Sequence, residues 1–240
     1  MRRRIEVKRR DSGALIAIAL TSLGALAIVS AQDAKPQIKV PQAGVPQIMT
    51  IEGEYIRIAY NNEGYVSLGY RTANQSVGEK WLFIEIGATM VPGKPNYTLT
   101  REALSLETPD GSTVPLPSNR DYQQVDLRAM ERRATVVHDR IDYFPPMASQ
   151  ACRIGFFSQP GSREMAYDQV ELSQNRGCLG RLYFPVPGGI THGQYWLNVK
   201  FPQSVVRVPF RILTEDENKL LKKNYKDIKK QVDNAFKKKS

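Results

Sequence analysis

The stretch "GRLYFPVPGGITHGQYWLNVKFPQSVVRVPFRIL", residues 180–213, decides the fold class of this 240-residue chain. In "QYWLNVKF" (194–201) apolar side chains alternate with mostly polar ones, and "VVRVPFRIL" (205–213) repeats that alternation. A period of two residues is typical of a strand with one buried face. The sequence therefore predicts two antiparallel strands joined by a short turn, with these side chains pointing inward: Tyr195, Leu197, Val199, Phe201, Val206, Val208, Phe210 and Ile212.

Two residues of this stretch carry further information. Pro209 has no N–H to donate to a neighbouring strand, so its strand should lie at a sheet edge or at a bulge. His192, one of only two histidines, stands at the end of the loop "PGGITHG" (187–193), with no acidic residue near it in the sequence. A loop histidine without a carboxylate neighbour is usually solvated, so we expect neither a catalytic nor a metal-binding role for His192.

Alternation extends upstream from this stretch. "EYIRIAY" (54–60) and "YVSLGYR" (65–71) flank the turn "NNEG" and predict a β-hairpin. "KWLFIEIGATM" (80–90) is the most apolar run of the body and predicts a central strand, and "PDG" (109–111) predicts a turn between two shorter strands. Many short strands with few helices predict a mainly β fold, an antiparallel β-sandwich.

A first helical segment interrupts this pattern at 118–137. Ser118 and Asp121 have the spacing of a capping box, and apolar residues then recur at steps of three and four, namely Leu127, Met130, Ala134 and Val137. Two interpretations stay open: an inserted helix between strands, or an irregular crossover with a single helical turn. Either one places an insertion at about 118–150.

The C-terminal segment 214–240 predicts a basic amphipathic helix. Thr214 and Glu217 form a second capping box, acids crowd the first turn, and nine lysines follow. The apolar stripe of this helix consists of Leu221, Tyr225, Ile228, Val232 and Phe236. It can pack on its own domain, on an envelope protein or a second copy of the chain, or the helix can lie on an anionic membrane surface.

The N-terminal segment 1–31 predicts export. Residues 1–12 hold six Lys or Arg against two acids, 13–29 contain no charge, and Val29 and Ala31 are small residues at the positions that precede a signal cleavage site. The competing interpretation is an uncleaved anchor, because a helix over 13–29 would span about 26 Å, slightly short of a ~30 Å hydrocarbon core. The expected location is periplasmic or extracellular, or the inner membrane if 13–29 stays as an anchor.

The chain between the leader and the C-terminal helix divides into two parts by composition. Residues 32–50 hold three prolines and no clear period, which predicts an extended tether before a domain at 51–213. The net charge of +10 lies mainly at the ends, since 1–12 carry +4 and 215–240 carry +4. A body of about +2 argues against a nucleic-acid partner, which would need basic residues spread over one surface.

The chain has two cysteines, Cys152 and Cys178, both in the part expected to be exported. In an oxidising compartment such a pair usually forms a disulfide, and the spacing of the two along the chain suits a link between neighbouring strands or across a loop. The alternatives are two buried free thiols or a redox pair, although the latter lacks the Cys-x-x-Cys spacing.

The run from "KWLFIEIGATM" through "REALSLETPDGSTVPLP" resembles the immunoglobulin-like domains that follow signal peptides in many bacterial envelope proteins. "RLYFPVP", "YWLNVKF" and "VVRVPFRI" are similar to the closing strands of those domains. The resemblance covers about half of the chain, and no lipid-attachment cysteine follows the leader. It implies an immunoglobulin-like sandwich that binds or spaces other envelope components, and it assigns no site residue.

No catalytic motif is present: the sequence has no GxSxG, HExxH, GxGxxG or phosphate-binding glycine loop, and no Cys/His set with zinc spacing. We therefore expect no catalytic residue, no cofactor and no metal, and a non-catalytic binding or scaffolding domain of the bacterial cell envelope. One alternative is a membrane-anchored accessory subunit of a larger envelope complex. Another is a hydrolase that uses Glu or Asp with His138 or His192.

Candidate contacts for a partner lie in three segments. The first is "DYFPPM" (142–147) with Tyr143 and Phe144, and the second is "GFFSQPG" (155–161) with Phe156 and Phe157. The third is the apolar stripe of the C-terminal helix. Each segment also has a core-packing interpretation.

Overall fold

The computed structural model describes residues 47–159 and 161–237, with side chains described as far as residue 235. The expected leader at 1–31, with its alternative as an anchor, and most of the expected tether at 32–50 lie outside these residues. Within the described part, no helix combines the length and the apolar content that a membrane crossing requires.

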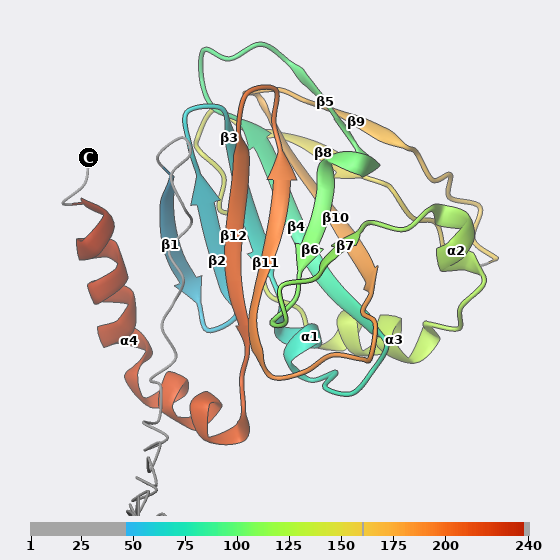
Figure 1. The fold of residues 1–240 in the computed structure, drawn as a ribbon. Coiled ribbons are helices and arrows are strands. Elements are labelled where there is room, and N and C mark those ends of the chain that lie inside the picture. The colour runs from blue at the N-terminus through green and yellow to red at the C-terminus, as the bar shows by residue number, and fades with distance from the viewer. Residues whose placement is uncertain (1–46, 160, 238–240) are drawn as a thin grey trace, which may run out of the picture. The chain divides into compact units, whose positions relative to one another are not determined.

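The largest sheet has six strands in the order β1-β2-β3-β4-β10-β8 (Figure 1). Its strands are β1 (Ile48–Gly53), β2 (Ile56–Tyr60), β3 (Gly64–Gly69), β4 (Trp81–Met90), β10 (Arg176–Pro185) and β8 (Gln150–Ile154). β2 and β3 form the predicted hairpin, and β4 is central, between β3 and β10. Both predictions are confirmed.

A second sheet has four strands in the order β12-β11-β6-β7, and β5 pairs with β9 separately. These strands are β12 (Val205–Ile212), β11 (Gly193–Lys200), β6 (Leu104–Glu107), β7 (Thr113–Pro115), β5 (Tyr97–Thr100) and β9 (Gln169–Leu172), with a 3₁₀ turn η1 at Arg101–Ala103. β11 and β12 pair antiparallel as predicted, and β12 is the edge strand that Pro209 requires. Gly111, with φ +86, closes the predicted turn between β6 and β7.

The inner faces of the two larger sheets contribute to one hydrophobic core. The eight side chains predicted to point inward from β11, the turn after it and β12 are at most 1% exposed, and they join apolar side chains of β3 and β4 in the same cluster. In Figure 1, β11 and β12 lie in front of the six-stranded sheet, between β2 and β4 in the view, and β12 contacts β2 and β3. The fold is mainly β, with antiparallel sheets and a C-terminal helix; the immunoglobulin-like assignment stays a prediction.

Two sequence predictions about strands need correction. Residues 48–50, assigned to the tether, begin β1, whose Met49 and Ile51 are buried against the core. β8 runs parallel to β10, so the six-stranded sheet is not wholly antiparallel. The local pattern hides both features, because the three prolines upstream of β1 resemble a tether and strand direction depends on a distant partner.

The insertion forms two short helices, α2 (Asn119–Gln123) and α3 (Arg128–Val136), and a third short helix, α1 (Arg71–Asn74), follows β3. The predicted capping box is present, since the Ser118 hydroxyl and the Asp121 carboxylate bond each other's backbone N–H groups. Leu127, Met130 and Ala134 are buried, which fixes α3 on the sheet. Helix is thus inserted between strands, as the first interpretation held, but it is divided into α2 and α3.

The C-terminal helix α4 (Glu215–Lys237) packs beside β1 at one edge of the six-stranded sheet (Figure 1). Its predicted cap is confirmed, because the Thr214 N–H donates to the Glu217 carboxylate at 2.9 Å. Leu221 is buried, and Lys229 donates to the Ile51 carbonyl at 2.6 Å. The apolar stripe of α4 therefore lies, at least in its first half, against its own domain.

Candidate functional site

A cavity of about 660 Å³ lies between β4, β10, the end of β8 and the chain that follows α3. Alternation along β4 and β10 sends Glu85 and Arg181 to the same face of the sheet, where they are direct partners in register. The residues 138–142 cross over this face. A further wall consists of Phe157, Gln159, Ser162 and Glu164. Insertion and sheet together thus border an open cavity large enough for a small molecule.

The carboxylate of Glu131 on α3 anchors the insertion beside this cavity. Its Oε1 accepts hydrogen bonds from the hydroxyls of Tyr122, at 3.1 Å, and of Tyr183. Its Oε2 accepts from the Arg181 guanidinium at 2.9 Å and from the Gln159 amide at 3.1 Å. Glu131 is buried, and with four donors its charge is compensated, so the network stabilises the docking of α3 on β10.

Three aromatic rings form the apolar wall of the cavity. Tyr122 lies 4.7 Å from Tyr183 and 5.0 Å from Phe157 between ring centroids, and Phe157 lies 5.2 Å from Tyr183. Burial raises the pKa of the Tyr183 hydroxyl well above its usual range, and the negative charge of Glu131 adds to the effect. Tyr122 has a raised pKa for the same two reasons, so both hydroxyls remain neutral donors at ordinary pH.

Glu85 on β4 is the acidic side chain that faces the cavity from the sheet. Burial raises the pKa of Glu85, whereas a hydrogen bond from the Asp139 backbone and the charges of Arg181 and His138 act in the opposite direction. The Asp139 N–H donates to Glu85 Oε2 at 3.4 Å. Gly69, opposite Glu85 on β3, leaves the room for this arrangement, since a Cβ there would lie 3.3 Å from the same oxygen and 2.9 Å from Ile141.

The other charged groups of the cavity are held in ion pairs. The Asp139 carboxylate forms an ion pair with the Arg71 guanidinium at 2.7 Å. This pair fixes the segment 138–142, which crosses over Glu85. Two more pairs lie at the rim, Arg140 with Asp142 at 2.8 Å and Arg153 with Glu164 at 2.5 Å. The rim pairs are largely exposed, so they contribute little stability and leave the cavity open to solvent.

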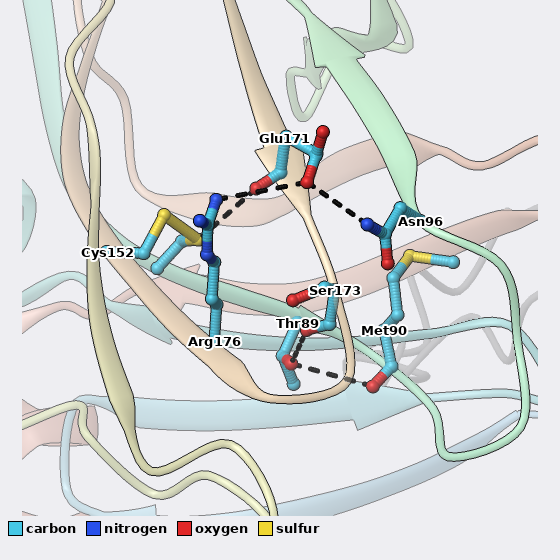
Figure 2. Close-up of a disulfide and its surroundings, with 8 residues drawn as sticks. Thr89, Met90, Asn96, Cys152, Glu171, Ser173 and Arg176 are labelled. Atoms are coloured by element: carbon cyan, nitrogen blue, oxygen red, sulfur yellow. Dashed lines mark hydrogen bonds and ion pairs between the residues drawn. A yellow bond between two sulfur atoms is a disulfide. The ribbon is translucent and has the colours of Figure 1, made fainter.

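A disulfide between Cys152 and Cys178 joins β8 to β10 beside this cavity (Figure 2). The two cysteines are partners in register, so the bond links neighbouring strands as the sequence predicted. Arg153 and Ile154, the next two residues of β8, line the cavity. The disulfide therefore fixes an edge strand that carries part of the wall.

Figure 2 also shows how the chain around this disulfide is tied down. The Thr89 hydroxyl donates to the Ser173 carbonyl at 2.9 Å, and the Asn96 amide donates to the Glu171 carboxylate at 3.1 Å. The first bond connects the turn between β9 and β10 to β4, and the second connects β9 to the chain before β5. The disulfide and these hydrogen bonds together hold the strands at this edge of the sheet in place.

The two histidines differ in their positions. His138 lines the cavity with Glu85 and Asp139, while His192 is exposed in the loop before β11, as the sequence predicted. In the described part of the chain no group of three or more His, Cys, Asp or Glu side chains is arranged to hold a metal ion.

The candidate partner contacts are spread over the molecule. Tyr143 is exposed and Phe144 is half-buried on the sheet, where it fills the space above Gly87 and Gly177. Phe156 and Phe157 are buried, as the core-packing interpretation of their segment predicts. On α4, Leu221 is buried and Tyr225, Ile228 and Val232 are half-buried, whereas the Phe236 side chain lies outside the described part.

Sequence reasoning singled out Phe157 and His138 but missed the other residues that build the cavity. Glu85 is the only charged residue of β4, and a lone carboxylate in the most apolar strand is the signal that could have found it. Glu131, Arg181 and Tyr183 carry no such signal, because they meet only through the docking of the insertion. No family model, curated protein or solved structure matches the chain.

Proposed function

We propose that this chain is an exported, non-catalytic binding domain of the bacterial cell envelope, with its ligand site in the cavity between β4, β10 and the insertion. The observation that carries the proposal is the cavity itself. Its volume of about 660 Å³ falls within the ~300–1,000 Å³ of typical small-molecule sites. Three aromatic rings and a few fixed polar groups give it the lining of such a site.

Two further observations support export and a binding role. The disulfide is compatible with an oxidising compartment, where the expected leader would take the chain. The polar groups around the cavity are held by hydrogen bonds and ion pairs, which suits a preformed recognition surface.

The test compares capture of envelope molecules by the wild-type chain and by a variant with an obstructed cavity. Leu179 on β10 lines the cavity and is 37% exposed, so Leu179→Trp adds bulk at its mouth without disturbing the core. Leu220→Trp on α4, where Leu220 is 58% exposed, adds the same surface elsewhere. Small molecules extracted from envelope fractions are incubated with each immobilised full-length protein and identified by mass spectrometry.

The proposal predicts molecules that the wild type and Leu220→Trp retain and that Leu179→Trp loses. Equal retention by all three proteins, or retention by none, would show that the cavity is not a ligand site.

A hydrolase is a second candidate, because one cavity contains both His138 and a carboxylate with a raised pKa, Glu85. It predicts turnover of ester, peptide or glycoside substrates by the full-length chain, lost in His138→Ala and kept in His192→Ala. Turnover that survives the replacement of both histidines would exclude this candidate.

A further inference from the structure

The charges around the cavity leave one carboxylate without an ion-pair partner. Every arginine and every acid that lines it, except Glu85, belongs to an ion pair within the described residues. The pairs are Arg71–Asp139, Arg140–Asp142, Arg153–Glu164 and Arg181–Glu131. His138 apart, the carboxylates and guanidiniums of the cavity and of its paired neighbours therefore sum to a single negative charge, on Glu85.

The nearest arginine is already engaged. Arg181 is opposite Glu85 in register, but its guanidinium donates to Glu131 at 2.9 Å, and no ion pair with Glu85 forms. Glu131 is the more buried acid and the one that holds α3, so drawing Arg181 toward Glu85 would uncover a buried charge. Among the described residues Glu85 therefore has no ion-pair partner of its own.

Hydrogen bonds from the described residues occupy only part of the Glu85 carboxylate. Its Oε2 accepts one long bond, 3.4 Å, from the Asp139 N–H, and among the described residues no donor bonds Oε1. A half-buried carboxylate gains free energy when a cation or a donor replaces the water that it has lost. Such a group is best satisfied by a cationic donor that arrives with a ligand.

The surroundings of Glu85 indicate what the rest of the ligand is like. The rings of Tyr122, Phe157 and Tyr183 and the side chain of Ile154 give the cavity an apolar wall. Aromatic faces also attract cations through their quadrupoles. The aromatic wall and the Glu85 carboxylate therefore both favour a ligand with a positive charge.

We propose that the cavity takes a ligand with one cationic amine or guanidinium group on an apolar body, and that Glu85 is its counter-ion. This inference deepens the proposed function and depends on the cavity being a ligand site.

Three probes of similar shape and different charge test it: benzylammonium, benzyl alcohol and benzoate. Each is titrated into the full-length chain, and binding is followed by the amide chemical shifts of Gly69, Glu85 and Asp139. The proposal predicts that benzylammonium binds at least tenfold more tightly than benzyl alcohol, and that benzoate binds more weakly still.

Glu85→Gln is the decisive variant, since glutamine keeps the shape and can still accept the Asp139 hydrogen bond. We expect benzylammonium to bind at least tenfold more weakly to it, with benzyl alcohol changed less than twofold. Glu102→Gln removes the same charge from an exposed site on η1, away from the cavity, and should leave all three affinities unchanged.

The results separate this inference from the proposed function. If Leu179→Trp abolishes the capture of envelope molecules but Glu85→Gln does not weaken benzylammonium, the cavity binds ligands and the cation inference is wrong. Tighter binding of benzoate, or no binding of any probe at these amides, would overturn the inference in the same way. Failure of capture and of all probes together would overturn both.

Discussion

At the scale of single residues, the close approach of the two sheets depends on Gly64 at the start of β3. The Phe201 ring occupies the space where a side chain would stand, since a Cβ on Gly64 would overlap its Cζ. Phe201 is itself buried, directly after the end of β11. The β11–β12 turn can therefore pack against β3 only because residue 64 is a glycine.

Gly64→Ala should lower the free energy of unfolding by about 2–3 kcal/mol, because overpacking displaces a buried ring. Gly155→Ala is the matched control: its Cβ would meet Tyr167 at an ordinary 3.4 Å, so we expect a change below about 0.5 kcal/mol. Urea unfolding of the two variants measures both values. Equal effects would contradict the assigned packing of Phe201.

The tyrosines around Glu131 predict a loss of stability at alkaline pH. Their pKa values are raised above the ordinary 10.0, so the unfolded chain ionises near pH 10 while the folded chain stays protonated. The unfolded state then binds fewer protons, and the free energy of unfolding falls as the pH rises, by up to about 1.4 kcal/mol per pH unit for each such group.

Tyr183→Phe tests this assignment by the slope of stability against pH, measured by urea unfolding from pH 8 to pH 11. The variant should be less stable at pH 8, because Glu131 loses a donor, yet its stability should fall less steeply above pH 10. An unchanged slope would contradict the assigned environment of Tyr183.

The sequence predicted few residues of the cavity, and the reason is physical. Burial within a strand follows from alternation, so the inward residues of β11 and β12 were predictable. Glu85, Arg181 and Glu131 come from three elements, and their contacts depend on register and on the docking of the insertion. His138 was singled out only because histidines are scarce in this chain.

At the scale of elements, α4 offers a direct test of where its apolar stripe lies. Leu221 is 7% exposed at the contact with the sheet, while the neighbouring Leu220 is 58% exposed. Leu221→Ala should lower the free energy of unfolding by about 2 kcal/mol and Leu220→Ala by less than about 0.5 kcal/mol. If the two changes are equal, α4 does not pack on β1 in this register.

The disulfide predicts a second effect at this scale. In a chain-entropy model, closing the loop across a sequence separation of 26 contributes about 3.5 kcal/mol. Replacing both cysteines by alanine should cost a similar amount, measured by urea unfolding, and added reductant should destabilise the wild type but not the double variant. A wild type that is insensitive to reductant would show that the bond contributes nothing.

Element prediction succeeded where the pattern is local and failed where pairing is distant. The β2–β3 hairpin, β4, the β11–β12 pair and both capping boxes follow from residues close in sequence. The parallel direction of β8 arises from its pairing with β10, which follows in the chain only after β9. The start of β1 was missed because three prolines upstream resemble a tether.

At the scale of the whole molecule, the fate of the segment 1–31 decides between a released domain and an anchored subunit. N-terminal sequencing of the protein isolated from cells measures it directly. We expect Gln32 as the first residue, in keeping with small residues at Val29 and Ala31. An intact Met1 or Arg2 would support the anchored accessory subunit instead.

The architecture as a whole places the proposed ligand site away from α4. The cavity depends on the insertion and on the disulfide-linked strand β8, whereas α4 covers β1 at the opposite edge of the sheet. A ligand in the cavity should therefore protect one part of the sheet and leave the helix unchanged.

Hydrogen–deuterium exchange of the full-length chain, with and without a small-molecule extract of the envelope, tests the central claim most directly. The account predicts slower exchange in β4, in β10 and at 138–142, with α4 unaffected. Protection confined to α4, or no protection anywhere, would contradict it.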